Sequence, residues 1–474
     1  MLRRTKIVAT LGPSTDNPET LKGIIDAGLD VARINFSHGV AEDHRGRARL
    51  LRKCAAEVGR QVGLLADLQG PKIRIEEFES GQITLQEGAK FTLSARLGAT
   101  EGNEHQVGIT YKELPRDVAI GDTLLLDDGN IVLHVSRVTD SQVETLVETG
   151  GVISNYKGIN RLGGGLSASA LTEKDHADVR LAAEMEVDYL AVSFPRNAVD
   201  LHVARELYRA AGGKGGICAK IERTEAIQEL DEIIKAADCV MIARGDLGVE
   251  LGDAELPGIQ KRIISSSRAL NCVVITATQM MQSMVESPQP TRAEVLDVAN
   301  SVMDGTDAVM LSAETAIGRH PVKVVEAMDR ICRGAERHHS TLVSRHRLES
   351  KFENTEEAIA MASMYTANHF NVAAILALTE SGATAKWMSR ISSGIPIYAM
   401  TRHVATQRRV TLYRGVYPIN FDVDSEDEAP VDEEIVRELL RRGAVRGGDR
   451  IVITKGDLTG VSGGTNVMKI VRAV

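Results

Sequence analysis

Eight short apolar runs recur along the chain, and each is followed by a segment with helical spacing. They are TKIVATLG (5–12), DVARINFSHG (30–39), VGLLADLQG (62–70), VDYLAVSFP (187–195), GICAKIE (216–222), CVMIARGDLG (239–248), CVVITATQ (272–279) and DAVMLSAET (307–315). Apart from one long gap, they are spaced by roughly thirty residues, the length of one strand–helix–strand unit. Uniformly apolar strands indicate burial on both faces, as in a parallel sheet. Eight such units predict an α/β fold with a closed (β/α)8 barrel.

The long gap lies between the third and fourth runs. Residues 71–166 form short alternating segments broken by DG, GN and GG turns, which is typical of a small antiparallel β domain. Its insertion after the third strand puts it over the barrel end where active sites lie, so we expect a lid. The barrel then comprises residues 1–70 and 167–340. Residues 345–474 alternate helical and strand patterns, which predicts a C-terminal α/β domain.

Composition narrows the class of protein. A net charge of −9 and an aromatic content of 3% argue against a surface that binds nucleic acid. The chain has no run of eighteen apolar residues, and its N-terminus has no signal core, so we expect no membrane association. Five cysteines form no CxxC pair, as expected of buried thiols in a cytoplasmic protein.

The fifth run contains charged residues where a buried strand should be apolar. Side chains of a strand alternate between its faces, so Cys218, Lys220 and Glu222 share one face. Burying two ions costs several kcal/mol each unless they are well paired. Taken alone, this pair could be structural.

Six of the eight runs turn polar at the same end, however. The polar residues are Arg33, Asn35 and Ser37 in the second run, Asp67 in the third, Lys220 and Glu222 in the fifth, Asp246 in the sixth, Thr278 in the seventh, and Ser312 and Glu314 in the eighth. Barrel interiors are usually filled with Val, Ile and Leu. This pattern therefore favours an active site over a set of structural ion pairs.

The residue types suit phosphoryl transfer. Glu222 and Asp246 are oxygen ligands of the kind that Mg²⁺ prefers, while Arg33 and Lys220 suit a phosphoryl group. Gly245 allows backbone N–H groups to approach an anion closely. Phosphoryl transfer needs this combination of positioning and charge stabilisation. The chain has no GxxxxGK[ST], GxGxxG or HExxH motif.

Longer motifs resemble those of the pyruvate kinase family. They are TKIVATLGPST, ARINFSHG, AKIERTEAI, VMIARGDLGVE, ITATQMMQSM, PTRAEVLDVANSVMDGTDAVMLSAETAIGRHP and SGGTNVMKI, and they span nearly the whole chain in the expected order. The PKIR form, with GINRLGGGLSASALTEKD, is most similar to bacterial type II members. The resemblance implies the last step of glycolysis, phosphoryl transfer from phosphoenolpyruvate to ADP, giving pyruvate and ATP.

The resemblance also implies a role for each matching residue. The catalytic residues are Lys220, which stabilises the transferring phosphoryl group, Arg33, which binds phosphate, and Thr278, which lies near the route of enolate protonation. The substrate site comprises Arg33, Lys220, Gly245, Asp246, Thr278 and Ser312, and the Mg²⁺ ligands, with Mn²⁺ as an alternative ion, are Glu222 and Asp246. Asn35, His38, Arg74 and Lys157 are expected on the nucleotide.

One departure from the family concerns the monovalent cation. Asn35, Ser37 and Asp67 match the usual ligands, but LQGPKIR replaces the TKGPEIR of potassium-dependent members. Leu68 therefore replaces a threonine ligand, and Lys72 stands where a glutamate would be. A built-in ammonium can supply the positive charge of K⁺. Our hypothesis is that K⁺ is not required and that the three ligands hold Lys72 instead.

The C-terminal domain resembles the family's effector domain. Thr379, Ser381, Gly382 and Thr384 in LTESGATAKW can seat a phosphate at a helix start, with the loop at 454–466 closing over it. In the family such sites bind fructose bisphosphate, AMP or other sugar phosphates, which predicts allosteric activation. An ordinary N-cap is the alternative for these residues. The resemblance also implies a homotetramer.

Two other functions share part of the pattern. A Mg²⁺-dependent lyase or aldolase barrel acting on pyruvate-like acids would use the carboxylate pair, but it needs neither a nucleotide lid nor Lys220. A catalytically silent sensor of sugar phosphates would use the third domain, but it has no reason to keep Lys220, Glu222, Asp246 and Thr278.

Overall fold

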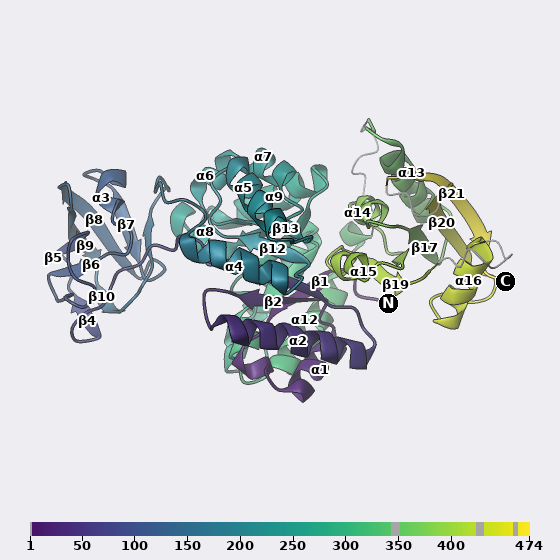
Figure 1. Cartoon of the computed structure of the whole chain (residues 1–474), viewed down its shortest axis with the longest axis horizontal. Coiled ribbons are helices and arrows are strands. Elements are labelled where there is room, and N and C mark those ends of the chain that lie inside the picture. The colour runs from purple at the N-terminus through teal and green to yellow at the C-terminus, as the bar shows by residue number, and fades with distance from the viewer. Residues whose placement is uncertain (1, 343–350, 423–430, 458–462) are drawn as a thin grey trace.

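The computed structural model describes residues 2–342, 351–422, 431–457 and 463–474. Three parts follow one another along the longest axis of the molecule (Figure 1). The barrel lies in the centre, the segment inserted after its third strand lies at one end, and the C-terminal segment lies at the other. The lid and the C-terminal domain therefore contact opposite sides of the barrel.

All eight apolar runs form strands of one closed parallel barrel, as predicted. The strands are β1 (Lys6–Thr10), β2 (Val31–Asn35), β3 (Gly63–Asp67), β12 (Tyr189–Val192), β13 (Gly216–Ile221), β14 (Cys239–Ala243), β15 (Val273–Ala277) and β16 (Ala308–Leu311). Each pairs with its neighbours along the chain, and β16 closes the barrel on β1. The carboxyl ends of all eight strands therefore meet at one mouth.

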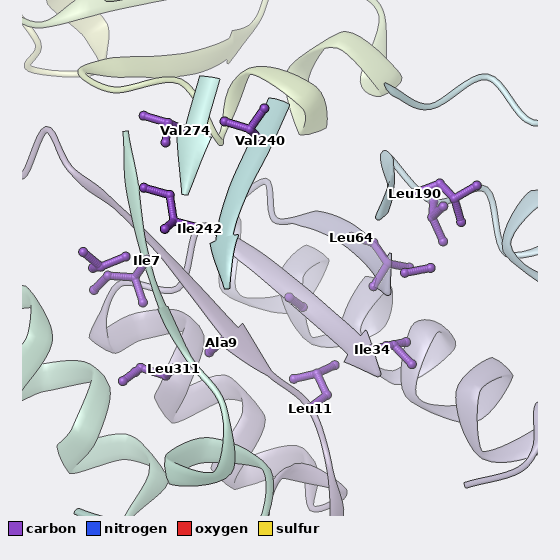
Figure 2. Packing of buried hydrophobic residues seen from close by; sticks show 14 of the residues in the cluster. Ile7, Ala9, Leu11, Ile34, Leu64, Leu190, Val240, Ile242, Val274 and Leu311 are labelled. Carbon is purple, nitrogen blue, oxygen red and sulfur yellow. The ribbon is translucent and has the colours of Figure 1, made fainter. Parts of the chain in front are cut away.

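Helices surround the barrel. They are α1 (Pro18–Ala27), α2 (Ala41–Val58), α4 (Glu173–Glu184), α5 (Ala198–Ala210), α6 (Thr224–Gln228), α7 (Leu230–Ala236), α8 (Arg244–Leu251), α9 (Leu256–Ala269), α10 (Arg292–Asp304), α11 (Ala313–Ala316) and α12 (Pro321–Ala335), with 3₁₀ turns η1 (Pro13–Thr15), η2 (Gln282–Val285) and η3 (His339–Thr341). The strands bury their outward faces against these helices in one apolar cluster. Figure 2 shows part of this cluster, including Ile7, Leu64, Val240 and Leu311.

The two faces of β13 separate as the alternation predicts. Ile217, Ala219 and Ile221 belong to the cluster between strands and helices, whereas Cys218 belongs to a different cluster, inside the barrel. Lys220 follows Cys218 on the inner face. The charged end of this strand therefore lies within the barrel mouth.

The inserted segment forms two sheets. Its elements are β4 (Gln82–Leu85), β5 (Lys90–Ser94), β6 (Gln106–Gly108), α3 (Leu114–Asp117), β7 (Thr123–Leu126), β8 (Ile131–Val138), β9 (Gln142–Thr149), β10 (Gly151–Ser154) and β11 (Ile159–Arg161). A six-stranded sheet has the order β11-β7-β8-β9-β5-β6, and β4 pairs with β10. The pairing is antiparallel except between β5 and β6. This segment has its own apolar core.

The C-terminal segment forms a five-stranded sheet with the order β19-β18-β17-β20-β21. Its elements are α13 (Thr355–His369), β17 (Ala374–Leu378), α14 (Ala383–Ser389), β18 (Ile397–Thr401), α15 (Val404–Val410), β19 (Val416–Asn420), α16 (Val431–Arg441), β20 (Arg450–Gly456) and β21 (Thr465–Arg472). The last strand is antiparallel and lies at the sheet edge. The predicted α/β sheet is thus present.

This sheet is attached to the end of the barrel opposite the mouth. Val8, Val273 and other inward residues of the barrel share one apolar cluster with Ile375 and Met388 of the C-terminal segment. All five cysteines are free and buried. No helix in the described part of the chain is long and apolar enough to cross a membrane.

Candidate active site

A network of charges occupies the barrel mouth, centred on Asp67 at the end of β3. Arg33 of β2 donates through Nε to Asp67 Oδ2 at 2.7 Å and through Nη1 to Thr10 Oγ1 at 3.0 Å. Lys220 Nζ lies 3.3 Å from Asp67 Oδ1. Burial alone would raise the pKa of Asp67, but the charges of Lys220 and Arg33 outweigh it and lower that pKa. Asp67 is therefore ionised and holds both cations.

Lys220 makes three contacts. Its ammonium lies 2.9 Å from Glu222 Oε1 and 3.3 Å from Asp67 Oδ1, and it donates to Ser193 Oγ at 2.7 Å. Although burial disfavours a charged amine, the two carboxylates raise the pKa of Lys220 above its ordinary value. The lysine is thus a fixed, permanently charged cation.

Glu222 is almost fully buried, immediately after β13. Its Oε2 accepts a hydrogen bond from the backbone N–H of Phe194 at 2.8 Å. Burial raises the pKa of Glu222, the charge of Lys220 opposes that effect, and the nearby charge of Asp246 adds to it. The two carboxylates are therefore close enough to repel each other.

Asp246 lies in the first turn of α8, directly after β14. The preceding residue, Gly245, donates its N–H to Thr278 Oγ1 at 2.9 Å, which joins the ends of β14 and β15. Thr278 has φ = 66°, an unusual backbone conformation for a β-branched residue. Backbone strain of this kind is concentrated at functional sites.

One cavity connects these residues to the lid, with a volume of about 620 Å³. From the barrel side it is lined by Gly245, Asp246, Thr278 and Ser312, and from the inserted segment by Lys72, Leu125, Asp128, Gly129 and Leu162, among others. Residues of the insertion and of the barrel mouth therefore line one cavity. The cavity is large enough for a small phosphorylated acid.

The position of Lys72 differs from our expectation. Its ammonium lies 3.1 Å from Asp246 Oδ1, so the hypothesis that Asn35, Ser37 and Asp67 hold it is wrong. The reason is that Asp67 already has Arg33 and Lys220 as partners. Lys72 lies on the segment after β3, and from there its side chain reaches Asp246.

Asn35 and Ser37 contact each other, since Asn35 Oδ1 accepts from the Ser37 backbone N–H at 3.1 Å.

The residues predicted for the nucleotide fall in two places. Arg74 and Lys157 lie on paired segments where the chain enters and leaves the lid, because the N–H of Ile75 donates to the Lys157 carbonyl at 2.9 Å. Lys157 forms an ion pair with Asp127 at 2.7 Å. Asn35 is the last residue of β2, and His38 follows it in the next turn and is exposed.

The return segment of the lid is attached to the barrel by hydrogen bonds to its backbone groups. Arg223 donates to the carbonyls of Leu166 and Ala168 at 3.2 and 3.4 Å. The N–H of Gly163 donates to the Glu250 carbonyl at 2.9 Å. Burial raises the pKa of Glu250 to about 7, with Glu225 and Asp246 adding to the effect. Helix α8, which carries Asp246, therefore also holds the lid.

Sequence reasoning missed two residues at the mouth, Ser193 and Arg244. Ser193 follows β12 and contacts Lys220; a polar residue at the end of the fourth run was the available signal. Arg244 donates through Nη1 and Nη2 to Asp297 at 2.7 Å each, and through Nη2 to the Thr278 carbonyl at 2.8 Å. The pairing of Arg244 with Asp297 could not be predicted from the sequence, because the fold brings these distant residues together.

Of the residues predicted for an effector, Thr379, Ser381 and Gly382 form a turn before α14, and Thr384 lies in its first turn. The N–H of Gly382 donates to Thr379 Oγ1 at 2.9 Å, and that of Ala383 donates to Ser381 Oγ at 3.4 Å. Thr384 Oγ1 lies 2.8 Å from Thr465 Oγ1. Residues 458–462 of the loop expected to close over the turn lie outside the described residues.

A barrel with a cation-rich mouth beneath an inserted domain defines an enzyme that acts on a small anionic substrate. Comparison with known proteins narrows this class. Residues 2–325 match the family described as pyruvate kinase, barrel domain, and residues 357–471 match the one described as pyruvate kinase, alpha/beta domain. The chain belongs to the pyruvate kinase family.

The sequences of individual relatives match this chain over nearly their full lengths. Pyruvate kinase II of Salmonella typhimurium is 56% identical over 99% of this chain and 98% of its own. The pyruvate kinase of Haemophilus influenzae is 54% identical over 96% of both chains. That of Buchnera aphidicola subsp. Acyrthosiphon pisum is 53% identical over 100% of this chain and 99% of its own. The lyase and the silent sensor are not supported by these matches.

Proposed function

We propose that this chain transfers the phosphoryl group of phosphoenolpyruvate to ADP, giving pyruvate and ATP. One observation carries the proposal: the amine of Lys220 lies between Asp67 and Glu222, at 3.3 and 2.9 Å, with Arg33 on the same aspartate. Two fixed cations beside a carboxylate pair match the needs of phosphoryl transfer, in which the protein positions groups and stabilises charge.

The two carboxylates fit a divalent cation. Glu222 and Asp246 would hold Mg²⁺ or Mn²⁺, because they lie near enough for the charge of one to raise the pKa of the other. The described residues contain no group of three or more acidic, histidine or cysteine side chains that could hold a metal. Mg²⁺ commonly uses one or two carboxylates and takes its other ligands from water and substrate phosphate. When bound, the ion withdraws charge from phosphoryl oxygens.

The remaining residues bind and orient the substrates. Arg33 and Lys220 hold the phosphoryl group, and the positive charge of Lys220 stabilises it during transfer. Gly245, Thr278 and Ser312, which line the cavity, hold the enolpyruvate portion. The nucleotide is bound by two pairs of residues. Asn35 and His38 lie at the end of β2 and just after it, and Arg74 and Lys157 lie where the chain enters and leaves the lid. The lid excludes water from the cavity during transfer.

The test is pyruvate release from phosphoenolpyruvate, ADP and Mg²⁺ by the purified full-length protein. We expect turnover that requires all three components. Release of pyruvate at equal rates without ADP would indicate hydrolysis or a different reaction and would contradict the proposal.

Potassium independence is the second part of the proposal. Asp67 is already neutralised by Arg33 and Lys220, and Lys72 adds a further ammonium at the mouth. We expect the initial rate to change by less than about twofold when potassium replaces tetramethylammonium at constant ionic strength. Many-fold activation by potassium would show that an empty cation site remains.

Regulation and assembly complete the proposal. The turn before α14 is the proposed seat for the phosphate of a sugar-phosphate or AMP-type effector, which would activate the enzyme. A homotetramer is the proposed assembly, in keeping with the family. The cytoplasm is the proposed compartment, supported by five free, buried cysteines.

A further inference from the structure

Both carboxylates assigned to the divalent cation carry a lysine ammonium. Glu222 Oε1 lies 2.9 Å from Lys220 Nζ, and Asp246 Oδ1 lies 3.1 Å from Lys72 Nζ. The second oxygen of Glu222 accepts the N–H of Phe194. The two ammonium groups together match the charge of one dication, and each sits on one oxygen of its carboxylate. A metal ion that takes either of these oxygens therefore displaces the ammonium.

The two lysines are held differently. Lys220 has Ser193 and Asp67 as further partners, so it stays in place when Glu222 binds a metal. In the described part of the chain, Lys72 forms an ion pair with one carboxylate only, that of Asp246. Lys72 is half-buried on the segment that enters the lid and lines the cavity above Asp246. It is therefore the lysine that can leave its carboxylate.

We propose that Lys72 is a tethered competitor of the divalent cation, occupying Asp246 until the metal displaces it and then pairing with the anionic substrate. This inference rests on the proposed function, because it takes Asp246 as a metal ligand. The displaced ammonium stays at the cavity, so a phosphorylated acid that binds there gives it a new partner. Metal and substrate then favour each other's binding, and by linkage the effect is reciprocal.

Lys174 provides a matched control. Its ammonium donates to the Phe36 carbonyl at 2.7 Å, just beyond the end of β2, and pairs with Asp178 at 2.6 Å. It therefore carries the same charge at the same end of the barrel, and neither Glu222 nor Asp246 is among its partners in the described residues. Replacing it measures the general effect of removing one positive charge from the mouth.

The experiment measures binding of Mn²⁺ to the full-length protein without nucleotide, from the paramagnetic resonance signal of free Mn²⁺. We expect Lys72→Met to bind Mn²⁺ about tenfold more tightly than the wild type, the effect of one unit charge in contact. Lys72→Arg and Lys174→Met should stay within about twofold. Adding phosphoenolpyruvate should then tighten Mn²⁺ binding more in the wild type than in Lys72→Met.

The outcomes separate this inference from the proposed function. Equal Mn²⁺ affinities for the wild type, Lys72→Met and a second variant, Lys72→Gln, would overturn the inference, provided that Asp246→Asn weakens binding. If Asp246→Asn leaves the affinity unchanged, the metal site itself is wrong, and the inference falls with it. Circular dichroism of each variant checks that the fold is retained.

Discussion

At the scale of single residues, Ser193 orients the amine of Lys220. Its hydroxyl donates to the Leu68 carbonyl at 2.7 Å, which leaves an oxygen lone pair to accept from Lys220 Nζ, also at 2.7 Å. Gly70 lets the chain pass close by, since a Cβ there would lie 2.7 Å from the Cβ of Ser193. The amine thus has a neutral acceptor in a fixed place.

Replacing Ser193 should reduce catalysis more than stability. Hydrogen bonds to charged groups contribute about 1.5–3 kcal/mol, so we expect Ser193→Ala to lower kcat by about tenfold or more. The KM for phosphoenolpyruvate should change less, because Arg33 still binds the phosphate. Steady-state kinetics checks this, with Ser193→Thr as the control that keeps the hydroxyl. An unchanged kcat in Ser193→Ala would show that Lys220 needs no such support.

Two of the predicted catalytic residues, Arg33 and Lys220, share Asp67 as a partner, whereas the partner of Lys72 was not predictable. Strand alternation and the shared polar ends were enough to bring Arg33, Asp67 and Lys220 to one mouth. The partner of Lys72 depends on where a hinge segment passes, and a long flexible side chain can reach several carboxylates. Sequence alone therefore could not distinguish Asp67 from Asp246.

At the scale of elements, the start of α10 supports the loop after β15. Thr291 caps the helix by accepting from the N–H of Glu294 at 3.3 Å, and Glu294 accepts from the N–H of Thr291 at 2.7 Å. Glu294 also accepts from the N–H of Ser283 at 2.7 Å, which joins η2 to α10. The sequence PTRAE at residues 290–294 has the pattern of such a reciprocal cap.

Loss of this cap should destabilise the barrel modestly. Thr291→Ala removes the acceptor for a backbone N–H that has no partner within the helix, which typically costs about 1 kcal/mol. Urea unfolding followed by far-ultraviolet circular dichroism measures the loss, and Thr291→Ser, which keeps the hydroxyl, should lose much less. Equal losses in both variants would argue against capping as the cause.

The types of secondary structure were predictable because the spacing of apolar residues differs strongly between helices and strands. Apolar runs followed by helical spacing identified all eight barrel strands, and GG and DG turns identified the antiparallel insertion. The parallel pairing of β5 with β6 was not foreseen, because the order of strands in a sheet depends on contacts between distant segments.

At the scale of the whole molecule, a buried ion pair connects the barrel to the C-terminal domain. Arg390 donates through Nη1 to Asp307 Oδ2 at 2.8 Å and to the Cys272 carbonyl at 2.7 Å. Both side chains of the pair are 1% exposed. The pair therefore fixes the C-terminal domain to the barrel.

Breaking this pair should destabilise the assembly of the two domains. Arg390→Met leaves Asp307 buried without its partner, which typically costs about 3–5 kcal/mol. Thermal unfolding measures the effect, and Arg49→Met, which breaks an exposed ion pair with Glu42, serves as the control with little expected change. If both variants unfold at the same temperature as the wild type, the pair is not structurally important.

The central claim is that the amine of Lys220 stabilises a phosphoryl group at the barrel mouth. The most direct measurement compares pyruvate release by the wild type and Lys220→Met, each confirmed as folded by circular dichroism. Removing one preorganised charge-stabilising group typically costs about 10²–10³-fold in kcat, and we predict a loss of at least that size. Turnover of Lys220→Met at the wild-type rate would contradict the account.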